Sequence, residues 1–244
     1  HRDLHYPLRR QRQMCIRDRN STDNVIIGRG AGRGGAGEFT NNIAIGSYAL
    51  DGTTTNDVDG TVAIGHYAGS AITSGAGNTA LGYEALKTSA TESQSVAIGY
   101  QSMALTANSS ENTMVGYKSG YDLSAGSDNN TGIGHNALSG THGSGASEKN
   151  TAIGSGSMVG AINGAAHNTA LGYNTLAAVT SGDNNIAIGN NALDALTTTN
   201  NMVAVGYNAG TAVNHAGAEG GTFVGYKAGA AVSCGGRNTA LGYE

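Results

Sequence analysis

The sequence predicts an all-β fold, a parallel β-solenoid (β-roll) of about 13 coils with a repeat of 17–20 residues. The first observation is a hexapeptide, Asn-Thr-Ala-Leu-Gly-Tyr, which occurs unchanged at 78–83, 168–173 and 238–243. The second is a glycine that closes a short apolar segment at nearly constant spacing. The third is composition: 40 glycines, 12% charged residues and no tryptophan suit stacked coils of small residues better than one compact core.

We call the recurring glycine the anchor glycine and use it to align the repeat units. The anchor glycines are Gly28, Gly46, Gly65, Gly82, Gly99, Gly116, Gly134, Gly154, Gly172, Gly189, Gly206, Gly225 and Gly242. A period of 17–20 residues held over so many units indicates a repeat architecture, because chance does not maintain it.

Each unit is expected to contain one short β-strand just before its anchor glycine. Three residues before the anchor every residue is Val, Ile or Thr, and one residue before it every residue is Ile, Leu or Val. Such side chains suit a pleated strand, and positions two residues apart share a face of it. We expect this face to line the coil interior. The predicted structural core is Ile45, Ile64, Leu81, Ile98, Val115, Ile133, Ile153, Leu171, Ile188, Val205, Val224 and Leu241.

The residue between these two positions is usually alanine and is expected to point to the opposite face. We interpret this alanine column as a contact with a partner chain, with a neutral exposed alanine as the alternative. Ile26, Met114 and Phe223 replace alanine with larger apolar residues, which favours contact over exposure. The candidate interchain contacts are Ala44, Ala63, Ala80, Ala97, Ala152, Ala170, Ala187, Ala204 and Ala240.

The rest of the unit reads as turns and loops. Asparagine recurs four residues before the anchor, where it suits a turn and, stacked on its copies, predicts an amide ladder. Tyrosine often follows the anchor, and Leu or Met often comes four residues after it, which predicts a second short strand or a tight corner. One coil buries too little apolar surface to offset the ordering of its chain, so coils must stack, and a side-by-side homotrimer is expected to add stability.

Residues 1–19 contain none of the repeat. The run from Arg9 to Arg19 resembles translated sequencing-adapter read-through in metagenomic gene predictions; the alternative is a basic arm that binds nucleic acid or an anionic surface. We expect residues 1–19 to be a non-native segment and residues 20–244 to be the β-solenoid repeat domain. The chain stops within a repeat unit at Glu244, so we expect a fragment open at its C-terminus.

Charge and composition disfavour several classes of function. Residues 1–19 hold six of the 13 basic and two of the 17 acidic residues, so residues 20–244 carry 7 and 15, a net charge of −8. We therefore expect no nucleic-acid partner. No apolar run has the length of a membrane-spanning helix, and we expect no membrane insertion. Cys15 and Cys234 have no local partner, so no disulfide framework is predicted.

No group of residues predicts catalysis, a cofactor or a metal, and we expect the chain not to be an enzyme. The glycine-rich segment around residue 30 lacks the Lys-Ser/Thr of a phosphate-binding loop, and Asp57–Gly60 supplies only half of a calcium loop. His66 and His135 lie in or beside the tyrosine column, four coils apart, which is too far to share a metal within one chain. An enzyme on a solenoid scaffold, such as a polysaccharide lyase, needs clusters of charged residues on neighbouring coils. This chain has few charged residues with which to form them.

The unit at Asn42–Gly46, Ser95–Gly99 and Asn185–Gly189 resembles the head repeat of YadA-like trimeric adhesins. The longer form at Asn78–Leu86 is more similar to repeats in tail-fibre proteins of marine phages. The resemblance implies a left-handed parallel β-roll whose three chains associate side by side. The spacing of 17–20 residues exceeds the usual YadA-like coil, which is a departure from that family.

From this resemblance we expect a structural and adhesive fibre segment of a phage tail fibre or similar virion appendage. The alternative is the head domain of a bacterial YadA-like trimeric surface adhesin. Both imply an extracellular location, on the virion or on the bacterial cell surface. The expected partners are further copies of the chain and a cell-surface receptor or glycan. Variable loops such as Ser139–Lys149 or Asp51–Gly60 are the expected receptor contacts.

Overall fold

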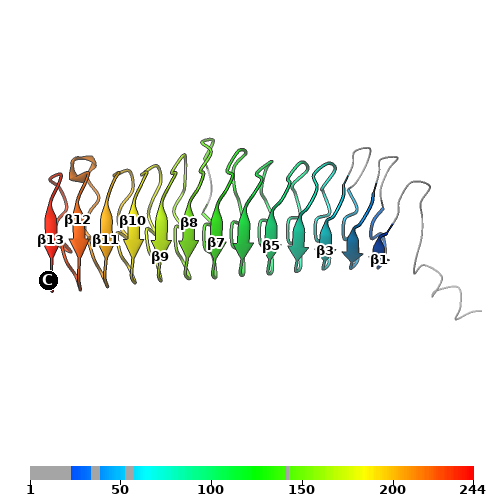
Figure 1. The fold of residues 1–244 in the computed structure, drawn as a ribbon, viewed down its shortest axis with the longest axis horizontal. Helices are drawn as coiled ribbons and strands as arrows, with labels where there is room; N and C mark the ends of the chain where they lie inside the picture. Colours follow the sequence, from blue (N-terminus) through cyan, green and yellow to red (C-terminus); the bar gives the residue numbers. More distant parts are fainter. Residues whose placement is uncertain (1–22, 34–38, 53–57, 141–142) are drawn as a thin grey trace, which may run out of the picture.

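The protein forms a β-solenoid in a computed structural model that describes residues 23–33, 39–52, 58–140 and 143–244. Thirteen parallel strands form one sheet along about 12 turns, with a repeat of about 18 residues, and the coils stack into a straight rod (Figure 1). The all-β, parallel solenoid predicted from the sequence is confirmed. Residues 1–19, the predicted non-native segment, lie outside the described residues.

Every strand has three residues and ends immediately before an anchor glycine. The order of strands in the sheet is the order in the sequence, so each coil contacts the coils before and after it. The strands are β1 (Val25–Ile27), β2 (Ile43–Ile45), β3 (Val62–Ile64), β4 (Thr79–Leu81), β5 (Val96–Ile98), β6 (Thr113–Val115), β7 (Thr131–Ile133), β8 (Thr151–Ile153), β9 (Thr169–Leu171), β10 (Ile186–Ile188), β11 (Val203–Val205), β12 (Thr222–Val224) and β13 (Thr239–Leu241). A 3₁₀ helix, η1 (Ala216–Ala218), lies between β11 and β12.

The strands are in register, so equivalent residues of successive units lie side by side. Ala80 pairs with Ala97, for example, and Leu81 with Ile98. The half-unit after each anchor glycine forms a turn in the described residues, so of the two predicted forms the tight corner is the one observed. Each coil therefore has one strand side and one loop side, and the sheet covers a single side of the rod.

The alanine column points into the coil, which is opposite to the prediction. The alanines named as candidate interchain contacts are buried: Ala44, Ala63, Ala80, Ala97, Ala152, Ala170, Ala187 and Ala204 have no exposed surface, and only Ala240 in the last strand is partly exposed. Their assignment to a partner chain is wrong, because the side chain of each meets the interior of its own coil.

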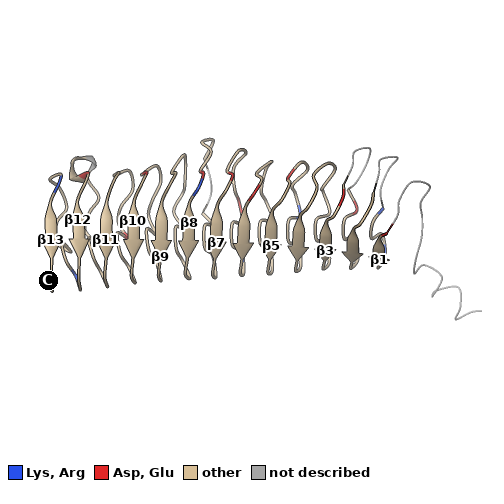
Figure 2. Cartoon of the chain, in the orientation of Figure 1, with Lys and Arg blue, Asp and Glu red and all other residues tan. Residues whose placement is uncertain are grey.

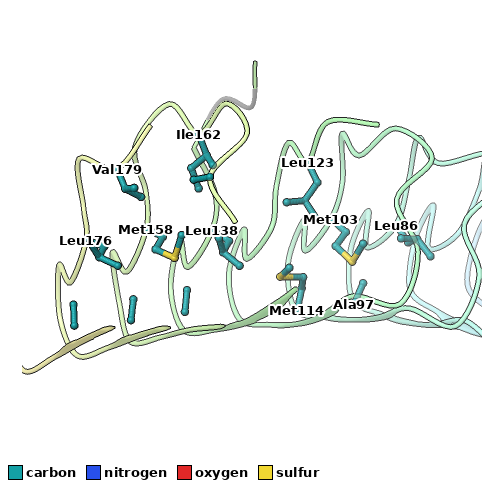
Figure 3. Packing of buried hydrophobic residues seen from close by; sticks show 14 of the residues in the cluster. Leu86, Ala97, Met103, Met114, Leu123, Leu138, Met158, Ile162, Leu176 and Val179 are labelled. Atoms are coloured by element: carbon teal, nitrogen blue, oxygen red, sulfur yellow. The ribbon is translucent and has the colours of Figure 1, made fainter. Parts of the chain in front are cut away.

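The two flanking columns point outward, so the predicted core is wrong as well. Every one of its members is half-buried or exposed: Ile45, Ile64, Leu81, Ile98, Val115, Ile133, Ile153, Leu171, Ile188, Val205, Val224 and Leu241. The reason is the width of the coil. Buried Leu and Met side chains four residues after the anchor, such as Leu86, Met103 and Leu138, fill the interior from the turn, which leaves room for only a methyl group on the strand (Figure 3).

The larger residues in the alanine column also fill the interior rather than contacting another chain. Where Met114 replaces alanine, the position four residues after the anchor is Gly120, and a Cβ on Gly120 would lie 2.8 Å from Met114 Cγ. Ile26 is matched in the same way by Gly32, with 2.8 Å between the added Cβ and Ile26 Cδ1. Phe223 is likewise matched by Gly229. In these three coils a large residue on the strand is therefore accommodated by a glycine on the turn.

The predicted asparagine ladder is present and lies in the core. Asn112, Asn130, Asn150, Asn168 and Asn185 come from five successive coils and are buried. In each step the side-chain oxygen accepts from the next asparagine's backbone N–H, while the side-chain amide donates to a carbonyl on the loop side, as in Asn168 Nδ2 to Gly182 O at 2.7 Å. In these coils the ladder ties the strand side to the loop side.

The anchor glycines have φ angles from +124° to +143°, a region that other residues rarely adopt. The coils also approach most closely here. A Cβ on Gly99 would overlap the carbonyl group of Gly116 in the next coil, with 2.7 Å to its carbon. Glycine at this position is required by backbone conformation and by the spacing of the coils together.

Candidate interaction surface

The outward residues of the strands form one continuous uncharged surface, rich in aliphatic side chains, which we call the outer face. It consists of the residues three and one before each anchor glycine, all of which are Thr, Val, Ile or Leu. Ile186, Leu171 and Ile133 are 41%, 44% and 39% exposed, which is high for aliphatic side chains on a sheet. The strands carry no charged residue, and in Figure 2 the red and blue segments lie in the connections between them.

An aromatic column borders the outer face at the position directly after the anchor glycine. His66, Tyr83, Tyr100, Tyr117 and His135 stack in sequence, with ring centroids 5.0–5.4 Å apart and planes within 6–10° of parallel. A second stack contains Tyr207, Tyr226 and Tyr243. Because the rings stack face to face, the edges of the rings and the hydroxyl groups of the tyrosines point to solvent.

Basic side chains lie along the aromatic column. The Lys118 ammonium is 4.9 Å from the centre of the Tyr121 ring and 5.6 Å from that of Tyr117. Lys227 is placed similarly over Tyr226, and Arg29 over Tyr48. These contacts are of the cation–π kind and order the long side chains beside the outer face without placing a charge on it.

Glu84 and Lys87 form the best-defined ion pair beside this surface. Lys87 Nζ lies 2.9 Å from Glu84 Oε1, and Gln101 donates from Nε2 to Glu84 Oε2 at 2.8 Å. The hydrogen bond from Lys87, and then that from Gln101, lowers the pKa of the Glu84 carboxyl. The negative charge of Glu84 in turn raises the pKa of Tyr83.

The outer face has the properties of a protein-contact surface. Isolated exposed aliphatic residues are ordinary, but a strip of aliphatic and threonine side chains without a charge along a whole rod is not, because exposed apolar surface of that extent favours association. The residues predicted as the coil core are half of this strip. The alanine column, predicted as the contact surface, lies in the core, and the Ile, Leu and Val column, predicted as the core, lies on the outer face.

The other predicted site elements do not come together. His66 and His135 are separated by three tyrosines of the same stack, and within the described ranges no three His, Cys, Asp or Glu residues are arranged to hold a metal. Asp59 Oδ1 accepts from the backbone N–H and hydroxyl of Thr40, and Asp57 lies outside the described residues. The loops Asp51–Gly60 and Ser139–Lys149 are described only in part.

The helix content gives no candidate for a membrane span: among the residues that the structure covers, no helix is long and apolar enough to cross a bilayer.

Comparison with known proteins returned nothing similar, since no family model matches the chain and neither the curated proteins nor the solved structures contain a match.

Proposed function

We propose that this chain is a structural and adhesive fibre segment that works as a side-by-side homotrimer with the outer faces of its three copies turned toward one another. The observation that carries the proposal is the uncharged outer face, continuous over thirteen strands and bordered by stacked aromatic rings. Burying half-exposed Ile, Val and Leu residues in every coil stabilises an assembly by about 25 cal/mol per Å² of apolar surface.

The resemblance of the repeat supports a virion appendage such as a phage tail fibre as its setting. The head domain of a bacterial YadA-like trimeric adhesin is the second candidate, since it shares the repeat pattern and the side-by-side arrangement. In either setting the chain has an extracellular, non-enzymatic role, and a cell-surface receptor or glycan is the partner of the assembled fibre. A rod in which strand, turn and loop repeat without interruption suits spacing and display better than chemistry.

The homotrimer is tested by multi-angle light scattering of the full chain. One chain has a mass of 24.4 kDa, and the expected mass of the assembly is three times that value. The double variant Ile153→Lys/Ile188→Lys, with both changes on the outer face, is expected to give a monomer with unchanged circular dichroism. Ser181→Lys, on the loop side, adds a charge outside the outer face and is expected to remain a trimer. A monomeric unmodified chain would overturn the proposal.

The two biological settings are separated by what the assembled rod binds. Fluorescently labelled protein is incubated with a panel of bacterial cells and with animal cells and extracellular matrix. Binding confined to bacterial cells supports the tail fibre, whereas binding confined to animal cells or matrix supports the adhesin head. Absence of binding to both would contradict the adhesive part of the proposal and leave a spacer role.

A further inference from the structure

A buried carboxylic acid on the loop side departs from the rest of its column. Glu92 lies seven residues before its anchor glycine and has no exposed surface. The equivalent buried residues of other described coils are small or apolar: Phe39, Val58, Ser109, Ser127, Ser147, Ala165, Thr199 and Ala218. One coil therefore places an ionisable group where its neighbours place part of the core.

The surroundings of Glu92 suit a neutral carboxyl better than a carboxylate. The backbone N–H of Ser109 reaches Oε1 at 3.4 Å, while Oε2 makes no hydrogen bond within the described residues. The buried hydroxyl oxygen of Ser89 is also without a partner there, and a protonated carboxyl has an O–H to donate. A carboxylate in this position leaves a charge without the several donors that stabilise buried anions.

The charged groups near Glu92 do not compensate it. Asp128, which is negative and lies two coils further along the rod, disfavours the charged form of Glu92. Burial raises the pKa of Glu92 to about 7, and Asp128 adds to this rise. The nearby hydroxyls of Ser89 and Thr106 and the N–H of Ser109 oppose it in part, although among these groups only the Ser109 N–H lies within hydrogen-bond distance.

The backbone of Glu92 is also a rung of the asparagine ladder. Asn78 Nδ2 donates to the Glu92 carbonyl oxygen at 2.7 Å, and Asn78 Oδ1 accepts from Ser95 N–H at 3.0 Å. A displacement of Glu92 toward water therefore breaks the link between the loop side and the strand side of this coil. The two flanking coils carry Thr61 and Ser95 at the asparagine position, so Asn78 provides this kind of link in its own coil alone.

We propose that Glu92 is a proton-dependent latch: its neutral side chain holds the loop side of this coil closed, and its ionisation releases residues 88–94 and 106–109 from the rod. The strands β4 and β5 stay paired on the other side. The result is a loop edge that opens more readily in mildly alkaline surroundings than in mildly acidic ones. This inference does not depend on the trimer or on the biological setting.

The test is amide hydrogen exchange of the full chain at pH 5 and pH 8, corrected for the intrinsic rate at each pH. The amides of Ser93, Gln94 and Ser109 report on the latch. With a pKa of about 7 in the closed state and the ordinary 4.5 in the open one, linkage predicts protection lower by about 50- to 100-fold at pH 8. The amide of Ile98 in β5 is expected to change little.

Glu92→Gln keeps the shape of the neutral side chain and is expected to abolish the pH dependence. Glu111→Gln removes an exposed carboxylate nearby and is expected to behave like the unmodified chain. If Glu92→Gln folds poorly, Glu92→Ser installs the residue that three other coils carry in this column. Equal protection at both pH values in the unmodified chain, or a pH dependence that persists in the Glu92 variants, would overturn the proposal.

Discussion

Met114 and Gly120 occupy complementary positions in one coil: the Met114 side chain fills the space that a side chain on residue 120 would take. A Cβ on Gly120 would lie 2.8 Å from both Cγ and Sδ of Met114. Six of the twelve other units invert the pair, with alanine on the strand and Leu or Met on the turn, as in Ala97 and Met103 (Figure 3). The two positions share one volume, so their side chains are energetically coupled.

This coupling predicts the outcome of a double-mutant cycle. Met114→Ala is expected to cost about 2–4 kcal/mol because it leaves a cavity. Gly120→Leu is expected to cost about 1–3 kcal/mol because the core is overfilled. The double variant restores the Ala/Leu pair of other coils, and Leu tolerates the turn because Leu86 and Leu138 have φ angles of +53° at the same position. It should be more stable than either single variant.

The measurement is urea unfolding followed by circular dichroism, and a coupling free energy of at least about 2 kcal/mol is expected. The same two changes in different coils, Met114→Ala with Gly69→Leu, provide the control, since Gly69 adjoins Ala63, Leu50 and Ile72 instead. Additive effects within the Met114 coil would show that the two residues do not share a volume.

The same complementarity explains how far the sequence predicted the fold. Strand positions, register and the glycine turns follow from columns of one residue type, and these predictions hold because period and β-branching are local properties. Which face of the strand is inside depends on what fills the coil from the turn, and that is a tertiary property. The pairing of Met114 with Gly120 and of Phe223 with Gly229, always six residues apart, was the sequence signal for it.

The candidate site was predictable to a smaller extent. The outer columns and the aromatic column are regular features of the sequence. The predicted contact at Ala80 is wrong because Ala80 is buried, and the contact that we propose lies on the other face of the strand, at Leu81 and its equivalents. Glu92 was missed because its loop has no fixed sequence pattern. Only the alignment of its coil with those of Val58 and Ser109 shows that it occupies a core position.

The asparagine ladder predicts a strong effect of a single amide. Asn168→Ala removes the acceptor of the Asn185 backbone N–H, at 2.9 Å, and the donor to the Gly182 carbonyl. Both groups are then buried without a partner, so a loss of at least about 2 kcal/mol in the free energy of unfolding is expected. The exposed Asn190, also replaced by alanine, is the control and should cost less than about 0.5 kcal/mol. Similar losses at both positions would mean that the ladder adds no stability.

The anchor glycine predicts a position at which even alanine is not tolerated. Gly99→Ala meets the carbonyl group of Gly116 and requires a φ near +130°, so a loss of about 3 kcal/mol or more is expected. Gly60→Ala also has a positive φ, +64°, but no atom lies within 4 Å of the added Cβ. It should cost about 1–2 kcal/mol, the intrinsic penalty of the left-handed conformation. Thermal unfolding measures both, and equal losses would rule out the steric contribution.

The Glu84–Lys87 pair predicts a pH dependence opposite in sign to that of Glu92. Because its partners lower the pKa of Glu84 in the folded chain, the pair stabilises above the ordinary carboxyl pKa, and this stabilisation is lost as the pH falls through the lowered value. Glu84→Gln should therefore reduce stability at pH 7 but not at strongly acidic pH. The Lys87 side chain is 37% exposed, so solvent screening keeps the expected loss below about 1 kcal/mol.

Urea unfolding of the Glu84→Gln variant and the unmodified chain at pH 7 and in strong acid measures this difference. Glu148→Gln is the matched control, because Glu148 and Lys149 are separated by 3.6 Å and both are more exposed, so no measurable change is expected at either pH. A loss that is the same in acid as at pH 7 would assign the role of Glu84 to packing against the Gln101 side chain and not to its charge. A loss confined to pH 7 would show that the charge of Glu84 stabilises its turn, through Lys87 in the same coil and Gln101 in the next.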